Sequence, residues 1–78
     1  MKFSRLVGKA EKIVDRHARG QVVESEELSK LQHLLVDKIS RYEEKIAQTQ
    51  DEQKRDKLQT RLKVVKAQLQ KSRQLLVR

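Results

Sequence analysis

The sequence has no cysteine, no proline and no tryptophan, and its 78 residues include only two glycines and two aromatic residues, Phe3 and Tyr42. Without cysteine the chain forms neither a disulfide framework nor a thiolate metal site, and we expect it in a reducing, cytoplasmic location. No apolar run approaches the roughly 18 residues of a membrane-spanning helix, so we expect no transmembrane association. The basic N-terminal residues lack a following apolar stretch, so we also expect no secretory signal.

Charged residues, by contrast, are abundant. They make up 38% of the chain and hydrophobic residues 36%, against about 25% and 45–50% in an average globular protein. Such a composition is typical of long amphipathic helices, and a chain of this length forms one domain at most. We therefore predict a single all-α domain over residues 1–78.

The spacing of apolar residues predicts the first helix over residues 4–19. Apolar side chains between Phe3 and Ala18 recur at steps of three and four and fill one arc of the helix. Ser4 is the predicted N-cap, and Gly20 follows where a helix-ending glycine usually lies. This basic amphipathic helix also fits a membrane surface, but Glu11 and Asp15 interrupt its polar face.

Two longer helices are predicted over residues 26–47 and 50–77. Ser25 is the expected N-cap of the second, and Thr49 with Glu52 has the spacing of a capping box before the third. Each helix carries one apolar stripe, which we call the seam. The seam residues are Leu28, Leu31, Leu35, Ile39 and Tyr42 in the second helix, and Leu58, Leu62, Val65, Leu69 and Leu76 in the third.

A fold of the chain near residue 50 makes the two stripes meet. Tyr42 then faces Leu58, Leu35 faces Val65 and Leu31 faces Leu69, while Leu28 faces Ser72. We therefore predict a long antiparallel, coiled-coil-like hairpin that forms a small three-helix bundle with the shorter N-terminal helix.

Apolar residues also flank the seam on both long helices, and they leave two interpretations open. Either the first helix covers these flanks within the same chain, or they form the interface of a homodimer. The flanking residues are Leu34, Val36, Val64 and Leu75.

Potential catalytic and metal-binding residues are few. Ser29, His33 and Asp37 line up at four-residue steps, but they fall on the solvent side of the helix without an oxyanion hole or a pocket. His33 and Asp37 supply only two metal ligands, with no third nearby. His17 falls within the apolar arc of the first helix, so we expect it at the core boundary with one ring nitrogen hydrogen-bonded; a pH-sensitive contact is the alternative. We expect no enzyme activity, no cofactor, no metal site and no small-molecule substrate.

The net charge of +8 is unevenly distributed. Residues 21–50 carry four Lys and Arg against six acids, a net of −2, whereas residues 51–78 carry nine against three, a net of +6. A field of this sign attracts an acidic protein or a nucleic acid. The candidate anion or nucleic-acid contacts are Lys54, Arg55, Lys63, Lys66, Lys71 and Arg73.

Two functions therefore follow from the sequence. The main expectation is a non-enzymatic protein-interaction module that self-associates as a homodimer. The alternative is a basic protein that binds the phosphate backbone of nucleic acid through its C-terminal helix, with little sequence preference because no residue is placed to read base edges. Both aromatic residues belong to the apolar stripes, so neither is left to stack on unpaired bases.

Overall fold

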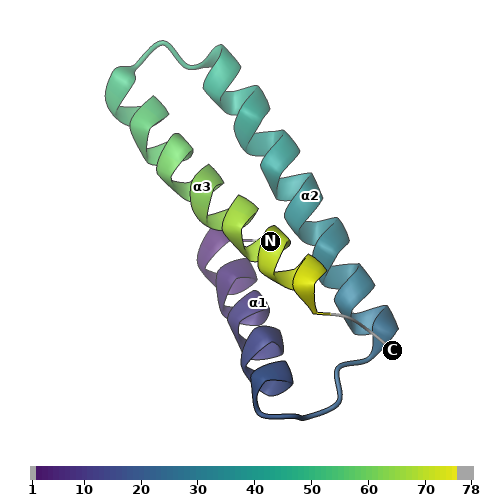
Figure 1. Ribbon diagram of the computed structural model, residues 1–78. Coiled ribbons are helices and arrows are strands. Elements are labelled where there is room, and N and C mark those ends of the chain that lie inside the picture. Colours follow the sequence, from purple (N-terminus) through teal and green to yellow (C-terminus); the bar gives the residue numbers. More distant parts are fainter. Residues whose placement is uncertain (1, 76–78) are drawn as a thin grey trace.

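The computed structural model describes residues 2–75 and consists of three helices. Helix α1 spans Phe3–Ala18, α2 spans Ser25–Gln48 and α3 spans Glu52–Gln74. As Figure 1 shows, α2 and α3 run antiparallel as a long hairpin, and α1 packs beside the half of the hairpin away from its turn. The predicted all-α hairpin with a shorter N-terminal helix is confirmed. Within the described residues, no helix has the length and apolar character needed to cross a bilayer.

The helix starts differ from prediction because other residues occupy the N-cap positions. Helix α1 begins at Phe3 and α2 at Ser25, one residue early in each case; Lys2 and Glu24 occupy the N-cap positions, and neither makes a side-chain capping bond. Ser4 and Ser25 are therefore helical residues, and their assignment as N-caps was wrong. The end of α1 is as expected: Gly20 has a φ of 75° and donates its N–H to the His17 carbonyl at 3.0 Å. This left-handed backbone conformation costs glycine little.

The turn between α2 and α3 corrects another prediction. Asp51, and not Thr49, caps α3: its carboxylate accepts the N–H groups of Gln53 at 2.9 Å and Lys54 at 3.4 Å. The Thr49 hydroxyl instead donates to the Lys45 carbonyl at 2.6 Å, which ties it to the end of α2. Helix α3 consequently starts two residues later than predicted. It ends at Gln74, and the predicted end at residue 77 lies outside the described residues.

The hydrophobic core lies where all three helices meet. Most seam residues are buried there, while Ile39, Leu58 and Leu62 are partly buried and Leu76 lies outside the described residues. A hydrogen bond from the Gln32 side chain to the Ser72 carbonyl, 3.4 Å long, joins α2 to α3 one turn from the predicted pairing of Leu28 with Ser72. The buried hydrophobic residues are Leu6, Ala10, Ile13, Leu28, Leu31, Leu35, Tyr42, Val65 and Leu69.

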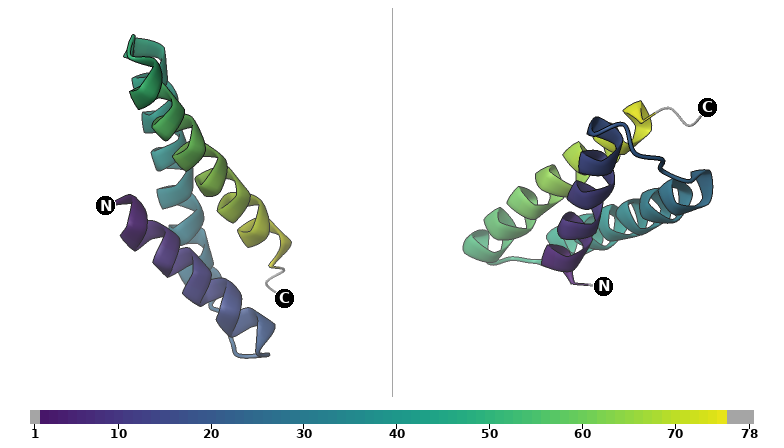
Figure 2. Two further views of the ribbon diagram at one scale, coloured as in Figure 1. Left: turned by 90° about the vertical axis from the view of Figure 1, so that its left-hand side faces the viewer. Right: turned by 90° about the horizontal axis from the view of Figure 1, so that it is seen from below.

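Helix α1 covers only part of the hairpin. Its N-terminal Phe3 lies against Tyr42 in the C-terminal third of α2, with ring centroids 6.3 Å apart, and Arg16 near its other end forms an ion pair with Glu27 at the start of α2. The hairpin therefore extends beyond α1 as two helices alone, which Figure 2 shows from two further sides. The molecule is elongated, with extents of 44 × 19 × 18 Å.

The flanking apolar residues were expected either to pack within the chain or to form a homodimer interface, and they do not all behave alike. Leu34 and Leu75 pack against the core of the same chain, and Val64 is partly buried. Val36, however, remains 49% exposed. Packing within the chain thus accounts for Leu34 and Leu75 and leaves Val36 on the surface.

Candidate functional site

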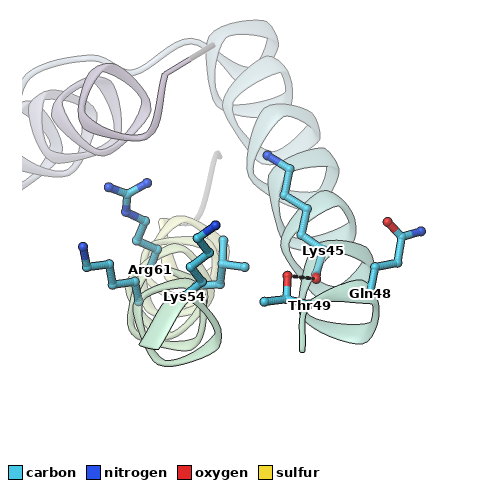
Figure 3. Close-up of a pocket in the computed structure, with 7 residues that line it drawn as sticks. Lys45, Gln48, Thr49, Lys54 and Arg61 are labelled. Atoms are coloured by element: carbon cyan, nitrogen blue, oxygen red, sulfur yellow. Dashed lines mark hydrogen bonds between the residues drawn. The ribbon is translucent and has the colours of Figure 1, made fainter. Parts of the chain in front are cut away.

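A hollow of about 460 Å³ lies between α2 and α3 next to the turn (Figure 3). Four of the seven residues that line it are cationic, and the lining contains no acidic residue. Asp56 borders a neighbouring hollow that is lined by α3 alone, together with Lys57 and Arg61. The lining residues are Lys45, Gln48, Thr49, Lys54, Lys57, Leu58 and Arg61.

Helix periodicity explains why these residues meet. Lys54, Lys57, Leu58 and Arg61 are spaced at i, i+3, i+4 and i+7, so they share one side of α3. Lys45 comes from the last turn of α2, across the hairpin. The only large apolar side chain in the lining is Leu58, which is partly buried and contacts the core. The hollow thus combines a small apolar floor with a cationic rim.

Arg61 connects the hollow to α1. Its guanidinium lies 5.4 Å from the centre of the Phe3 ring, a distance suited to a cation–π contact. It also hydrogen-bonds to Tyr42. Burial raises the pKa of the Tyr42 hydroxyl above its usual value, and the charge and hydrogen bond of Arg61 act in the opposite direction. Arg61 therefore lies between the N-terminal residue of α1 and the hollow.

Ion pairing leaves the cations of α3 without acidic partners. Across residues 2–75, the cations in ion pairs belong to α1, to its C-cap residue Arg19 or to α2. No ion pair in this range involves a cation of α3. The pairs include Arg16 with Glu27, Arg19 with Asp15 at 3.1 Å, Lys30 with Glu26 at 3.4 Å, and Arg41 with Asp37 at 3.1 Å. The positive field predicted for the third helix is thus not neutralised by local pairing.

The structure separates the predicted anion contacts from one another. Lys54 lines the hollow, but the Arg55 guanidinium donates to the Thr49 carbonyl at 2.7 Å and so contributes to the turn. Arg73 lies in a different hollow with His33 and Val36. The remaining candidates, Lys63, Lys66 and Lys71, are exposed on α3 away from both hollows.

The sequence-based selection missed Lys45, Lys57 and Arg61. Lys45 belongs to a stretch of negative net charge, and only the fold of the hairpin brings it near Lys54. Lys57 and Arg61 could have been chosen from their spacing with Lys54, because helical periodicity alone places the three on one side of α3.

The residues considered for catalysis and metal binding are separated from the hollow beside the turn. Ser29, His33 and Asp37 are exposed, and Asp37 pairs with Arg41. His17 is also exposed, so its predicted place at the core boundary was wrong: the buried face of α1 consists of Leu6, Ala10 and Ile13. Among the residues that the structure describes, no three His, Asp or Glu side chains are grouped to hold a metal ion.

No protein-family model, curated protein or solved structure matches this chain. Its function is therefore inferred from its own residues.

Proposed function

We propose that this protein is a non-enzymatic protein-interaction module and that the end of the hairpin near the turn is its binding surface. The observation that carries the proposal is the hollow beyond α1, where four cations surround the partly buried Leu58. Protein interfaces commonly combine an apolar centre with a polar rim, and complementary charges at the rim guide association. Farther from the turn, α1 already packs on the same face of the hairpin, so this face accepts a helix.

Site-specific photo-crosslinking in cells tests this proposal. A photoreactive phenylalanine analogue replaces Gln48, which lines the hollow, and the control carries it at Gln70, an exposed residue near the other end of α3. We expect a discrete protein adduct from position 48 and none of that mass from position 70. The adduct should weaken when Lys54 and Lys57 are replaced by Glu. Adducts with nucleic acid alone, or no adduct from either position, would overturn the proposal.

A second candidate function is supported by the cations of α3 that lack acidic partners. In this proposal, α3 binds the phosphate backbone of nucleic acid with little sequence preference. Replacing Lys63, Lys66, Lys71 and Arg73 by Gln removes four of these charges. The hollow beside the turn stays intact, because none of the four residues lines it. If the second function is right, the salt dependence of duplex binding should fall by about 0.9 in log–log slope for each lost phosphate contact.

The two functions predict different behaviour of the unmodified protein. Under the main proposal, duplex DNA binds weakly and binding disappears near physiological salt, because only screened surface charges are involved. Duplex binding that is still tight at physiological salt, about 0.15 M, and weakens steeply above it would favour the second function, because binding through many phosphate contacts depends on salt in this way.

A further inference from the structure

The hollow continues the surface on which α1 lies. Phe3 is the first residue of α1, and it contacts both Tyr42 of α2 and Arg61 of α3. Arg61 in turn lines the hollow. Figure 3 shows the side chains of Lys45, Lys54 and Arg61 extending to the side of the hairpin on which α1 lies. The two long helices therefore offer one continuous face, half of it covered by α1.

The covered half shows what kind of segment this face accepts. Helix α1 packs onto it with Leu6, Ala10 and Ile13, which are spaced at four and three residues and are at most 2% exposed. In the uncovered half, Leu58 offers the next partly buried apolar side chain. A short helix with a stripe of aliphatic residues would repeat the packing of α1 toward the turn.

The charge of the hollow then selects among such helices. Its rim carries Lys45, Lys54, Lys57 and Arg61, so a helix with acidic residues beside its apolar stripe complements it. The α1 helix of a second copy is a poor occupant because residues 1–20 carry a net charge of +4, from six Lys and Arg against two acids. A nucleic acid would meet the cations, but its phosphates gain nothing from Leu58, and the rings of Phe3 and Tyr42 already contact each other.

We propose that the hollow binds an acidic amphipathic helix of a partner protein, placed end to end with α1 on the same face of the hairpin. This inference rests on the proposed protein-interaction function and specifies the chemistry and shape of the partner. The partner's apolar residues contact Leu58, and its carboxylates approach the four cations. Bound in this way, the helix completes a three-helix arrangement along the whole hairpin.

Binding of a synthetic probe tests the inference. The probe is an acidic peptide of about 14 residues, with leucines at helical spacing flanked by glutamates and a hydrocarbon staple on its outer side to hold the helix. We expect fluorescence anisotropy to show saturable binding to the full chain. Amide chemical-shift changes should be concentrated in residues 45–49 and 54–61.

Two matched peptides separate the contributions of charge and apolar contact. Replacing the glutamates by glutamine should weaken binding at least about tenfold, because the rim charges lose their partners. Replacing the leucines by serine at unchanged charge should abolish saturable binding. If the serine peptide binds as tightly as the original, or if a single-stranded oligonucleotide of equal charge displaces the original from the hollow, the inference is overturned.

Two double variants of the protein localise the interaction. Lys54→Glu with Lys57→Glu changes the rim, whereas Lys63→Glu with Lys66→Glu makes the same change in net charge about 120–180° around α3. The first pair should weaken peptide binding about tenfold or more, and the second by less than about threefold. Equal losses from both pairs would show attraction to the overall charge and would overturn the inference. Circular dichroism verifies that each variant folds.

The two proposals fail in distinguishable ways. A crosslinked protein at position 48 combined with no binding of the acidic peptide would retain the interaction function and reject the acidic helix as its partner. Crosslinks to nucleic acid alone would reject the interaction function itself, whatever the peptide does.

Discussion

Asp51 is the residue on which the start of α3 depends, since its carboxylate accepts two backbone N–H groups of the first turn. Replacing an N-cap of this kind by alanine typically costs about 1 kcal/mol. We therefore expect Asp51→Ala to lower the free energy of unfolding by about that amount in urea titrations. Thr49→Ala is the control and should cost less, because the Thr49 hydroxyl donates to a carbonyl at the exposed end of α2. A larger loss for Thr49→Ala would identify Thr49 as the more important cap.

Tyr42 should make stability depend on alkaline pH. Burial raises the pKa of its hydroxyl, so the folded chain holds this proton more tightly than the unfolded chain does. Its contribution to stability is complete below the unfolded pKa of about 10 and is lost as pH rises through the folded pKa. In thermal denaturation from about pH 8 to about pH 11, Tyr42→Phe should therefore lose stability less steeply than the natural chain. Equal slopes for the two proteins would contradict this prediction.

Among the helices, the seam should tolerate changes unequally along its length. Leu35 is fully buried between the helices, whereas Leu62 is partly exposed. We expect Leu35→Glu to unfold the protein, because an unpaired buried charge costs several kcal/mol against a total stability of about 5–10 kcal/mol. Leu62→Glu should retain more of the helical circular-dichroism signal, since its carboxylate can reach water. Gln50→Gly, in the turn, should be mild. If Gln50→Gly lost more of the helical signal than Leu35→Glu or Leu62→Glu, the result would indicate that α2 and α3 do not form the hairpin.

The helices and their antiparallel pairing were predictable because each depends on the spacing of large apolar residues. The cap of α3 was not, because threonine and aspartate at neighbouring positions compete for the same backbone groups. Thr49 lies close to the correct place, yet Asp51 supplies the bonds to α3. The exposure of His17 was equally hidden, since only the packing of α1 on the hairpin shows how narrow its buried face is. Lys45 was missed for a related reason: the turn, and not the local sequence, brings it to the hollow.

At the scale of the whole molecule, we expect self-association through the face that carries Val36. This valine is 49% exposed and lines a hollow with His33, Leu69 and Arg73, a surface separate from the one beside the turn. Chains this short often gain stability by forming oligomers. Sedimentation equilibrium at micromolar concentration should show a homodimer, and Val36→Glu should shift it toward the 9.2 kDa monomer. A 9.2 kDa species alone at high concentration would contradict the prediction.

The elongated hairpin also determines how the molecule rotates in solution. Its longest extent, 44 Å, is more than twice the other two, 19 and 18 Å. Helical N–H bonds point nearly along their helix axis, and α2 and α3 follow the long direction of the molecule (Figure 1). Their amides therefore sense mainly the slow end-over-end rotation, whereas amides of residues 22–24, which no helix holds to this direction, also sense the faster rotation about the long axis. The ratio of ¹⁵N longitudinal to transverse relaxation times should accordingly be higher and more uniform along α2 and α3 than in that connection.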